Sequence, residues 1–168
     1  MIAITVLTLT LSGAMGLSAS LVKQERKAIA VQNMMDNSSY FLEYGGRFVR
    51  MAQKDDGDCI TSGQNYENIG GDLSTVAFLD YEDHCHEFLL EDGQIKERVS
   101  STDKVGDLGS ATPITSSKIT ISSLSFVITG DSANHQPRIT IRFSAEDQNF
   151  PESSMDVETT ISQRNLNS

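Results

Sequence analysis

The first 22 residues of this 168-residue chain carry no charged side chain, and no proline occurs before Pro113. Tryptophan is absent, and cysteine occurs only twice. A helix of 22 residues is roughly 33 Å long at about 1.5 Å per residue, and the hydrocarbon core of a bilayer is about 30 Å thick. The lack of charge and proline therefore predicts that residues 1–22 form an apolar helix half, buried in a membrane or in a bundle of helices.

Three interpretations of this segment stay open: a cleaved secretory signal, a plain single-span anchor, and a membrane-stored helix that later assembles with its own kind. A secretory signal needs a basic start, and no Lys or Arg precedes Lys23, although Ser18-Ala19-Ser20 fits a cleavage site. The charges of Lys23, Arg26 and Lys27 favour a cytoplasmic position for the following segment. The rest of the chain predicts an oxidising exterior. A basic segment upstream would remove this conflict, and the third interpretation is favoured.

Residues 23–54 continue as an amphipathic helix half. Apolar residues recur at steps of three or seven and predict a face that packs on a sheet: Val31, Met34, Phe41, Phe48 and Met51. Each glycine of the Gly45-Gly46 pair costs a helix about 1 kcal/mol relative to alanine, so we expect a break or kink there. The acidic stretch that follows Lys54 ends the helix.

Charge is distributed unevenly along the chain. Residues 1–54 hold six basic and three acidic residues, a net charge of +3, and residues 55–168 hold seven basic and 20 acidic residues, a net charge of −13. Residues 55–168 are therefore not expected to bind nucleic acid by themselves, because phosphate binding needs clustered Lys and Arg. Cys59 and Cys85 predict one disulfide in an exported domain, with two free core thiols as the alternative.

Alternating apolar residues predict that residues 55–168 form one β-rich globular domain. The expected strands are 74–80, 85–90, 94–99, 118–129, 138–146 and 153–162. Asp92-Gly93 predicts a tight hairpin turn, and a change of phase at Ser122-Ser123 predicts a bulge. Residues 100–117 are expected to be a long loop or an edge excursion. A long helix followed by antiparallel strands predicts an α+β fold, with the helix covering one face of the sheet.

Candidate chemistry is sparse. His84-Cys85-His86 suggests a metal site, but on a strand the two histidines share one face and the cysteine points away, and no further ligands are suitably spaced. Asp55, Asp56 and Asp58 offer oxygen ligands for calcium, although a solvated turn is favoured. The sequence contains no G-x-S-x-G motif and no phosphate-binding loop. We therefore predict no enzymatic activity, no metal, no cofactor and no small-molecule substrate.

Three stretches of the chain resemble type IV pilin-like proteins, specifically minor pilins and type II secretion pseudopilins. In the helix the resemblance is carried by Lys27-Ala28, Gln32, Asp36-Asn37, Leu42, Arg47 and Arg50-Met51-Ala52. Residues 76–99 are similar to the strand, cysteine and hairpin of these proteins, and residues 119–146 with 157–165 are similar to their closing strands. The family's processing site, a glycine before a phenylalanine-led run with a glutamate, is absent, and so is its helix-kinking proline. In place of that proline, Gly13 and Gly16 are the positions where this helix is expected to bend most easily.

The resemblance implies a non-enzymatic subunit that waits in the bacterial inner membrane, with its globular domain outside the cytoplasm, and then joins an extracellular or periplasmic filament. Its partners would be other pilin or pseudopilin subunits. Assembly would use the apolar helix half, where small residues permit close helix packing: Ile2, Ile4, Val6, Leu7, Leu9, Leu11, Gly13, Gly16 and Leu17. The alternative is a membrane-tethered or secreted monomeric β-domain that binds an extracellular ligand or surface.

Overall fold

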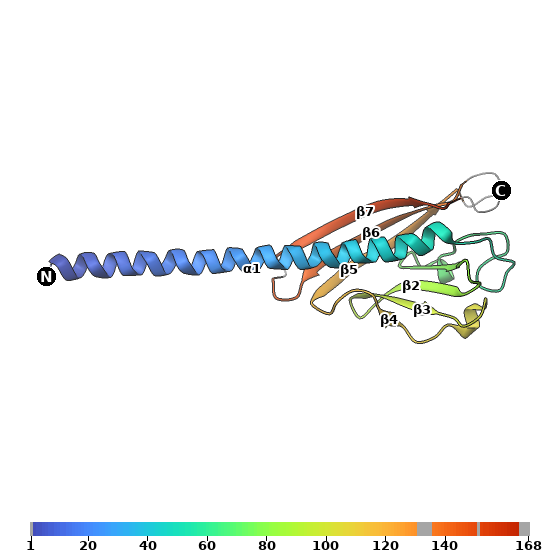
Figure 1. The fold of residues 1–168 in the computed structure, drawn as a ribbon, viewed down its shortest axis with the longest axis horizontal. Helices are drawn as coiled ribbons and strands as arrows, with labels where there is room; N and C mark the ends of the chain where they lie inside the picture. The colour runs from blue at the N-terminus through green and yellow to red at the C-terminus, as the bar shows by residue number, and fades with distance from the viewer. Residues whose placement is uncertain (1, 131–135, 151, 165–168) are drawn as a thin grey trace.

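The computed structural model describes residues 2–130, 136–150 and 152–164, with side chains from Ser18 onward except Ala19. One long helix leads into a β-rich domain, and its N-terminal part extends well beyond that domain (Figure 1). The elements are α1 (Ile2–Met51), the short 3-10 helix η1 (Ile69–Gly71), β1 (Thr75–Leu79), β2 (Cys85–Glu91), β3 (Gln94–Val99), the 3-10 helix η2 (Val105–Asp107), β4 (Thr112–Pro113), β5 (Ile119–Thr129), β6 (Arg138–Asp147) and β7 (Ser154–Ser162).

Helix α1 runs without interruption from Ile2 to Met51, so the expected break at Gly45-Gly46 is wrong. A Cβ atom on Gly45 would lie 3.3 Å from a Phe41 ring carbon and 3.5 Å from a Phe88 ring carbon, and one on Gly46 would lie 3.2 Å from Ile161 Cδ1. The two glycines therefore let the helix backbone approach the sheets closely. This packing offsets the poor helix propensity of glycine.

The helix ends three residues earlier than predicted, because the chain after Met51 joins the sheet. The Gln53 N–H donates a hydrogen bond of 2.9 Å to the Leu79 carbonyl at the end of β1. Gln53 and Leu79 form an isolated antiparallel bridge. This bridge takes the backbone group that another helical turn would have used.

The predicted α+β arrangement is confirmed, but the strands form two antiparallel sheets rather than one. The first has the strand order β1-β2-β3-β4, and the second has the order β5-β6-β7. The sheets meet along β5, where the Ile121 N–H donates to Gly93 O at 2.8 Å and the Phe126 N–H donates to Leu73 O at 2.7 Å. Helix α1 lies along both sheets (Figure 1).

Both predicted irregularities of the strands are confirmed. Asp92 and Gly93 have φ angles of 53° and 70°, the left-handed pair that a two-residue hairpin turn requires, and they join β2 to β3. The register of β5 against β6 shifts between Ile121 and Ser123, which is the bulge. Within the predicted loop 100–117, the two-residue strand β4 pairs with the edge of β3.

The core lies between α1 and the two sheets, and Phe41 stands at its centre. The Phe41 ring meets Phe88 of the first sheet edge-on at 6.0 Å and Phe143 of the second sheet at 5.8 Å. Buried apolar residues surround this contact: Met34, Val49, Phe78, Phe126, Ile139 and Ile141. One helix side chain thus joins both sheets.

Most of the predicted helix face packs as expected, and Val31 does not. Met34 and Phe41 are buried, Phe48 packs on the core while partly exposed, and Met51 is half-buried. Val31 is 37% exposed, whereas its neighbour Ala30 is 3% exposed. Successive residues are about 100° apart around a helix, so the face that meets the domain passes through Ala30 and Met34 and leaves Val31 at its border.

The apolar helix half is helical in backbone from Ile2 onward. Within the described part of the chain, no helix is both long enough and apolar enough to cross a membrane. The side chains of the predicted assembly residues, Ile2, Ile4, Val6, Leu7, Leu9, Leu11, Gly13, Gly16 and Leu17, lie outside the described residues.

Candidate functional site

The outer face of α1 exposes large apolar side chains where the helix leaves the domain. We define it by Val22, Ile29 and Tyr40, which are between 46% and 57% exposed. Leu21 and Met35 are also exposed, but they lie roughly 80–140° away around the helix. Val22, Ile29 and Tyr40 are 7 and 11 residues apart, spacings that return to nearly the same side of a helix. Exposed apolar residues that gather on one face are typical of an interaction surface.

Two hollows adjoin this face where α1 parts from the domain. One has a volume of about 530 Å³ and lies between Val22, Arg26 and Phe150. The other, of about 140 Å³, lies between Ile29, Ala30 and Phe150. Phe150 belongs to the β6–β7 connection, so the hollows mark the edge of the intramolecular contact. A further helix or loop would have room to pack there.

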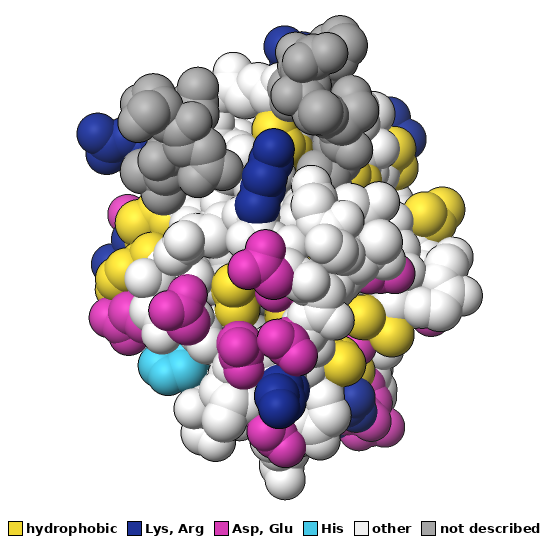
Figure 2. Space-filling view, turned by 90° about the vertical axis from the view of Figure 1, so that its right-hand side faces the viewer, with side chains coloured by type: hydrophobic (Ala, Val, Ile, Leu, Met, Phe, Trp, Pro, Cys, Tyr) yellow, Lys and Arg dark blue, Asp and Glu magenta, His cyan; other side chains and the backbone are white. Residues whose placement is uncertain are grey.

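Basic residues lie on α1 where it leaves the domain, and acidic side chains gather at the opposite end of the domain. Lys23, Arg26 and Lys27 are exposed on α1, and Lys23 forms an exposed ion pair of 3.8 Å with Glu152. Acidic side chains gather across the middle of the domain end that lies opposite the helix N-terminus (Figure 2). Exposed pairs contribute little to stability, so the basic segment remains available for attraction to an acidic partner.

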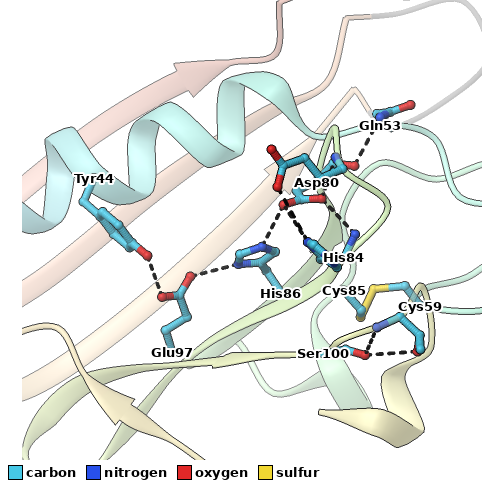
Figure 3. Close-up of polar contacts among 11 residues, drawn as sticks. Tyr44, Gln53, Cys59, Asp80, His84, Cys85, His86, Glu97 and Ser100 are labelled. Atoms are coloured by element: carbon cyan, nitrogen blue, oxygen red, sulfur yellow. Dashed lines mark hydrogen bonds and ion pairs between the residues drawn. A yellow bond between two sulfur atoms is a disulfide. The ribbon is translucent and has the colours of Figure 1, made fainter. Parts of the chain in front are cut away.

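A buried imidazole holds α1 to the first sheet. His86 of β2 is 4% exposed, with Nδ1 at 2.9 Å from Glu97 Oε1 and Nε2 at 3.0 Å from Asp80 Oδ2 (Figure 3). The Tyr44 O–H of α1 donates to Glu97 Oε2 at 2.7 Å. Both ring nitrogens of His86 are thus within hydrogen-bond distance of a carboxylate oxygen, one from the β1–β2 turn and one from β3. We call Tyr44, Glu97, His86 and Asp80 the His86 network.

Aromatic rings cover both faces of this imidazole. The Phe78 ring of β1 stacks on it at 5.4 Å with an interplanar angle of 7°, and the Phe48 ring of α1 lies at 4.9 Å. Burial raises the pKa of Tyr44, and the hydrogen bond to Glu97 raises it further. The network therefore keeps the phenol protonated and fastens the packed part of α1 to the sheet.

The predicted disulfide joins Cys59 to Cys85, with a Cα–Cα distance of 5.5 Å. It fastens the loop after α1 to the start of β2. Asp55 organises the same loop, because its Oδ2 accepts the N–H groups of Gly57, Cys59 and Ile60 at 2.9, 3.0 and 2.9 Å. The loop and the strand thus form one fixed unit beside the His86 network.

The structure shows how the residues of the two metal hypotheses, the acidic stretch after α1 and His84-Cys85-His86, are arranged. Asp55, Asp56 and Asp58 form no cluster of metal-ligating atoms among the described residues, and Asp55 is committed to backbone N–H groups. His84 and His86 do share one side, since both approach the Asp80 carboxylate, while Cys85 points away into the disulfide (Figure 3).

Sequence reasoning missed Asp80, Glu97 and Tyr44 as partners of His86. Two signals were present. Glu97 follows Ile95 by two residues in a strand, so both share the inward face. Asp80 directly follows a strand with four buried residues. A charged residue on an inward face indicates a buried partner.

The far face of the first sheet carries a shallow groove of about 830 Å³. Ile69, Val105 and Leu108 line it together with Glu87 and Arg98. The Glu87 carboxylate is largely buried and accepts from Arg98 Nη1 at 3.2 Å. The charged groups of the groove are thus already paired, which suits binding by shape more than proton transfer.

The chain was compared with protein-family models, with curated proteins and with solved structures. No protein-family model, curated protein or solved structure matches the chain. A functional inference therefore rests on the residues and their arrangement.

Proposed function

We propose that the chain is a non-enzymatic minor pilin or pseudopilin subunit that assembles into a type IV pilus-like or type II secretion filament. The observation that carries this proposal is the contrast within α1, a single helix of 50 residues. Its C-terminal part is buried against two sheets, and its N-terminal part extends past the domain (Figure 1). Leu21, Val22 and Ile29, where the helix leaves the domain, are 46% to 60% exposed.

An exposed apolar helix gains free energy when another apolar surface covers it. Like helices can supply that surface in a bundle. Gly13 and Gly16 would permit close approach between them, as small residues do at helix interfaces. Contacts between different faces of successive copies give an open filament when the rotation from one copy to the next does not close a ring, and this is the arrangement proposed here.

Charge supports the orientation of such contacts. The helix-bearing part of the chain carries a net charge of +3 and the remainder −13. In a staggered stack, the basic segment Lys23–Lys27 of one copy can face the acidic domain of another. Complementary charge gives specificity and speed of association more than affinity.

Before assembly, the uncharged run 1–22 is proposed to be stored in the bacterial inner membrane, with the acidic domain outside the cytoplasm. The disulfide fits this placement, because disulfides persist in oxidising compartments. Assembly then exchanges contacts with lipid for contacts with neighbouring helices.

A second candidate function is a tethered or secreted monomeric β-domain that binds an extracellular ligand or surface. The groove on the far face of the first sheet, about 830 Å³ in volume, favours it. In that case α1 is an anchor only, and its outer face contacts lipid or solvent rather than other copies.

Site-specific photo-crosslinking distinguishes the two candidates. A benzophenone amino acid at Ile29, on the outer face, is compared with the same label at Tyr81, an exposed residue of the β1–β2 turn. The full chain is purified in detergent, the detergent is removed, and the sample is irradiated. Filament assembly predicts a ladder of multimers from position 29 and few adducts from position 81. A monomer band alone from position 29 favours the tethered domain.

A further inference from the structure

The turn between β1 and β2 brings together three side chains of the kinds that ligate metals: Asp80 is buried, His84 is half-buried and Glu82 is exposed. One ligand atom each of Asp80, Glu82 and His84 lies within 4.8 Å of the other two. His84 Nδ1 is 3.9 Å from Asp80 Oδ2 and 4.0 Å from Glu82 Oε2. An imidazole thus faces two carboxylates from a single five-residue turn.

The distances of 3.9 and 4.0 Å from His84 Nδ1 to the two carboxylate oxygens are too long for hydrogen bonds. They are closer to the distances between ligand atoms around a bound metal ion. Hydrogen bonds between such atoms measure about 2.7–3.2 Å. Ligand atoms around a tetrahedral zinc ion with bonds of about 2.0–2.1 Å are about 3.4 Å apart. The ring nitrogens of His84 make no hydrogen bond to any described residue, and the side chain is 38% exposed. The imidazole is therefore accessible and needs only a small approach to complete a site.

The backbone of the turn is held in place on both sides. Asp80 Oδ1 accepts the N–H groups of Glu82 and His84 at 2.9 and 2.8 Å. The Asp80 carbonyl accepts from Gln53 Nε2 at 3.2 Å, and the residue after His84 is the disulfide-bonded Cys85. A turn fixed in this way loses little conformational entropy when it binds an ion.

A buried group also orients the Asp80 carboxylate from behind. His86 Nε2 lies 3.0 Å from Asp80 Oδ2, and Glu97 holds the other His86 nitrogen at 2.9 Å. Metal-ligating carboxylates are commonly oriented by such second contacts, and losing them weakens metal binding. This support comes from β2 and β3 and is independent of the exposed residues of the turn.

We infer that the β1–β2 turn binds a divalent transition-metal ion through Asp80, Glu82 and His84, with water completing its coordination. One imidazole and two carboxylates suit zinc and its neighbours better than calcium or magnesium, which prefer oxygen ligands alone. The site lies in the domain, so it does not depend on filament assembly.

The test is a calorimetric titration of the full chain, in detergent, with zinc chloride and separately with calcium chloride. One saturable zinc site is expected, with much weaker calcium binding. His84→Gln and Glu82→Gln should each lower the zinc affinity by about tenfold or more. Asp83→Asn is the matched control: Asp83 is an exposed acid of the same turn with φ 61°, a conformation that asparagine tolerates. Its affinity should stay within about twofold of wild type, well below the loss expected for a ligand.

Two outcomes would overturn the inference. One is the absence of saturable zinc binding at millimolar zinc. The other is an equal loss of affinity in Asp83→Asn and His84→Gln, which would show that acidic charge alone attracts the ion. Far-UV circular dichroism of each variant checks that the fold is intact, and Glu82→Gln, at an exposed position, keeps the test decisive if His84→Gln folds poorly.

Discussion

Helix α1 has a free half, residues 2–29, and a packed half, residues 30–51, and the described apolar side chains of the two halves meet opposite environments. In the packed half, Phe41 and Val49 are 1% and 0% exposed against the two sheets. In the free half, Leu21 and Ile29 are 60% and 57% exposed. The packed half obtains its stabilisation within the chain, whereas Leu21 and Ile29 would gain burial from another molecule or from lipid. The difference locates the part of the molecule where a partner is needed.

Glycine illustrates the same contrast. Gly45 and Gly46 lie in the packed half and bring the helix backbone close to Phe88 and Ile161. Gly13 and Gly16 lie in the free half, within continuous helix. If the free half packs on other helices, its glycines should allow the close approach there that Gly45 and Gly46 allow against the sheets.

The largest difference between the halves is expected from deleting one apolar side chain in each. Phe41→Ala should lower the free energy of unfolding by about 3–5 kcal/mol, because its ring contacts both sheets. Ile29→Ala should change it by about 0.5 kcal/mol or less, as surface substitutions usually do. Urea unfolding of both variants measures this. Similar losses would mean that α1 is not divided as described.

Removing the buried imidazole should have the next largest effect. His86→Gln removes the hydrogen-bond partner that the buried Asp80 and Glu97 carboxylates share, and leaving a buried carboxylate without its partner costs about 3–5 kcal/mol. We expect the lower end of this range, because glutamine still donates one hydrogen bond. His84→Gln, in the exposed turn, is the control and should be nearly neutral in urea unfolding without added metal. A neutral His86→Gln would contradict the role given to the network.

The same glycine substitution should act differently in the two halves. Gly45→Leu places a side chain where Phe41 and Phe88 carbons are already 3.3 and 3.5 Å from a Cβ, and overpacking of this kind costs about 1–3 kcal/mol. Gly13→Leu should leave the unfolding of the domain unchanged and weaken association after detergent removal. Unfolding and light scattering of both variants separate the two effects. If Gly13→Leu associates as strongly as the wild type, this would count against helix packing in the free half.

The smallest effect is expected from Tyr44 at high pH. Its pKa is raised in the folded protein, first by burial and then by Glu97. The folded protein therefore keeps a proton that the unfolded chain loses above about pH 10. This contribution to stability is complete below that pH and is lost as the pH rises toward the folded value. Tyr44→Phe should flatten the fall of the urea midpoint above about pH 10, and an unchanged slope in this variant would contradict the prediction.

Most of the fold could be predicted because its signals are local. Alternation along single strands and the Asp92-Gly93 turn place the hairpins to within a residue or two. The division into two sheets was missed, because alternation shows which face a residue takes and not which strand lies beside it. Val31 was misplaced because a stripe in the sequence leaves its border uncertain by one residue. The helix through Gly45 and Gly46 shows tertiary packing overriding local propensity.

The candidate sites were less accessible from the sequence. The His86 network joins residues from α1, β2, β3 and the β1–β2 turn, and Tyr44 and Glu97 are 53 positions apart. The metal-ligating turn places Asp80 and Glu82 beside His84, whereas the sequence directs attention to His84-Cys85-His86. Long-range contacts of this kind depend on strand pairing, which no single motif encodes.

The most direct test of the central claim is the molar mass of the full chain after detergent removal, measured by light scattering for wild type and for Ile29→Glu. Glutamate is a good helix former and Ile29 is 57% exposed, so the domain should unfold as in wild type. Packing of α1 on further copies of the chain predicts large multimers of the wild type and a clear shift toward monomer in Ile29→Glu. A wild type that stays monomeric, or a variant that assembles equally well, would contradict the claim that the outer face of α1 packs on further copies of the chain.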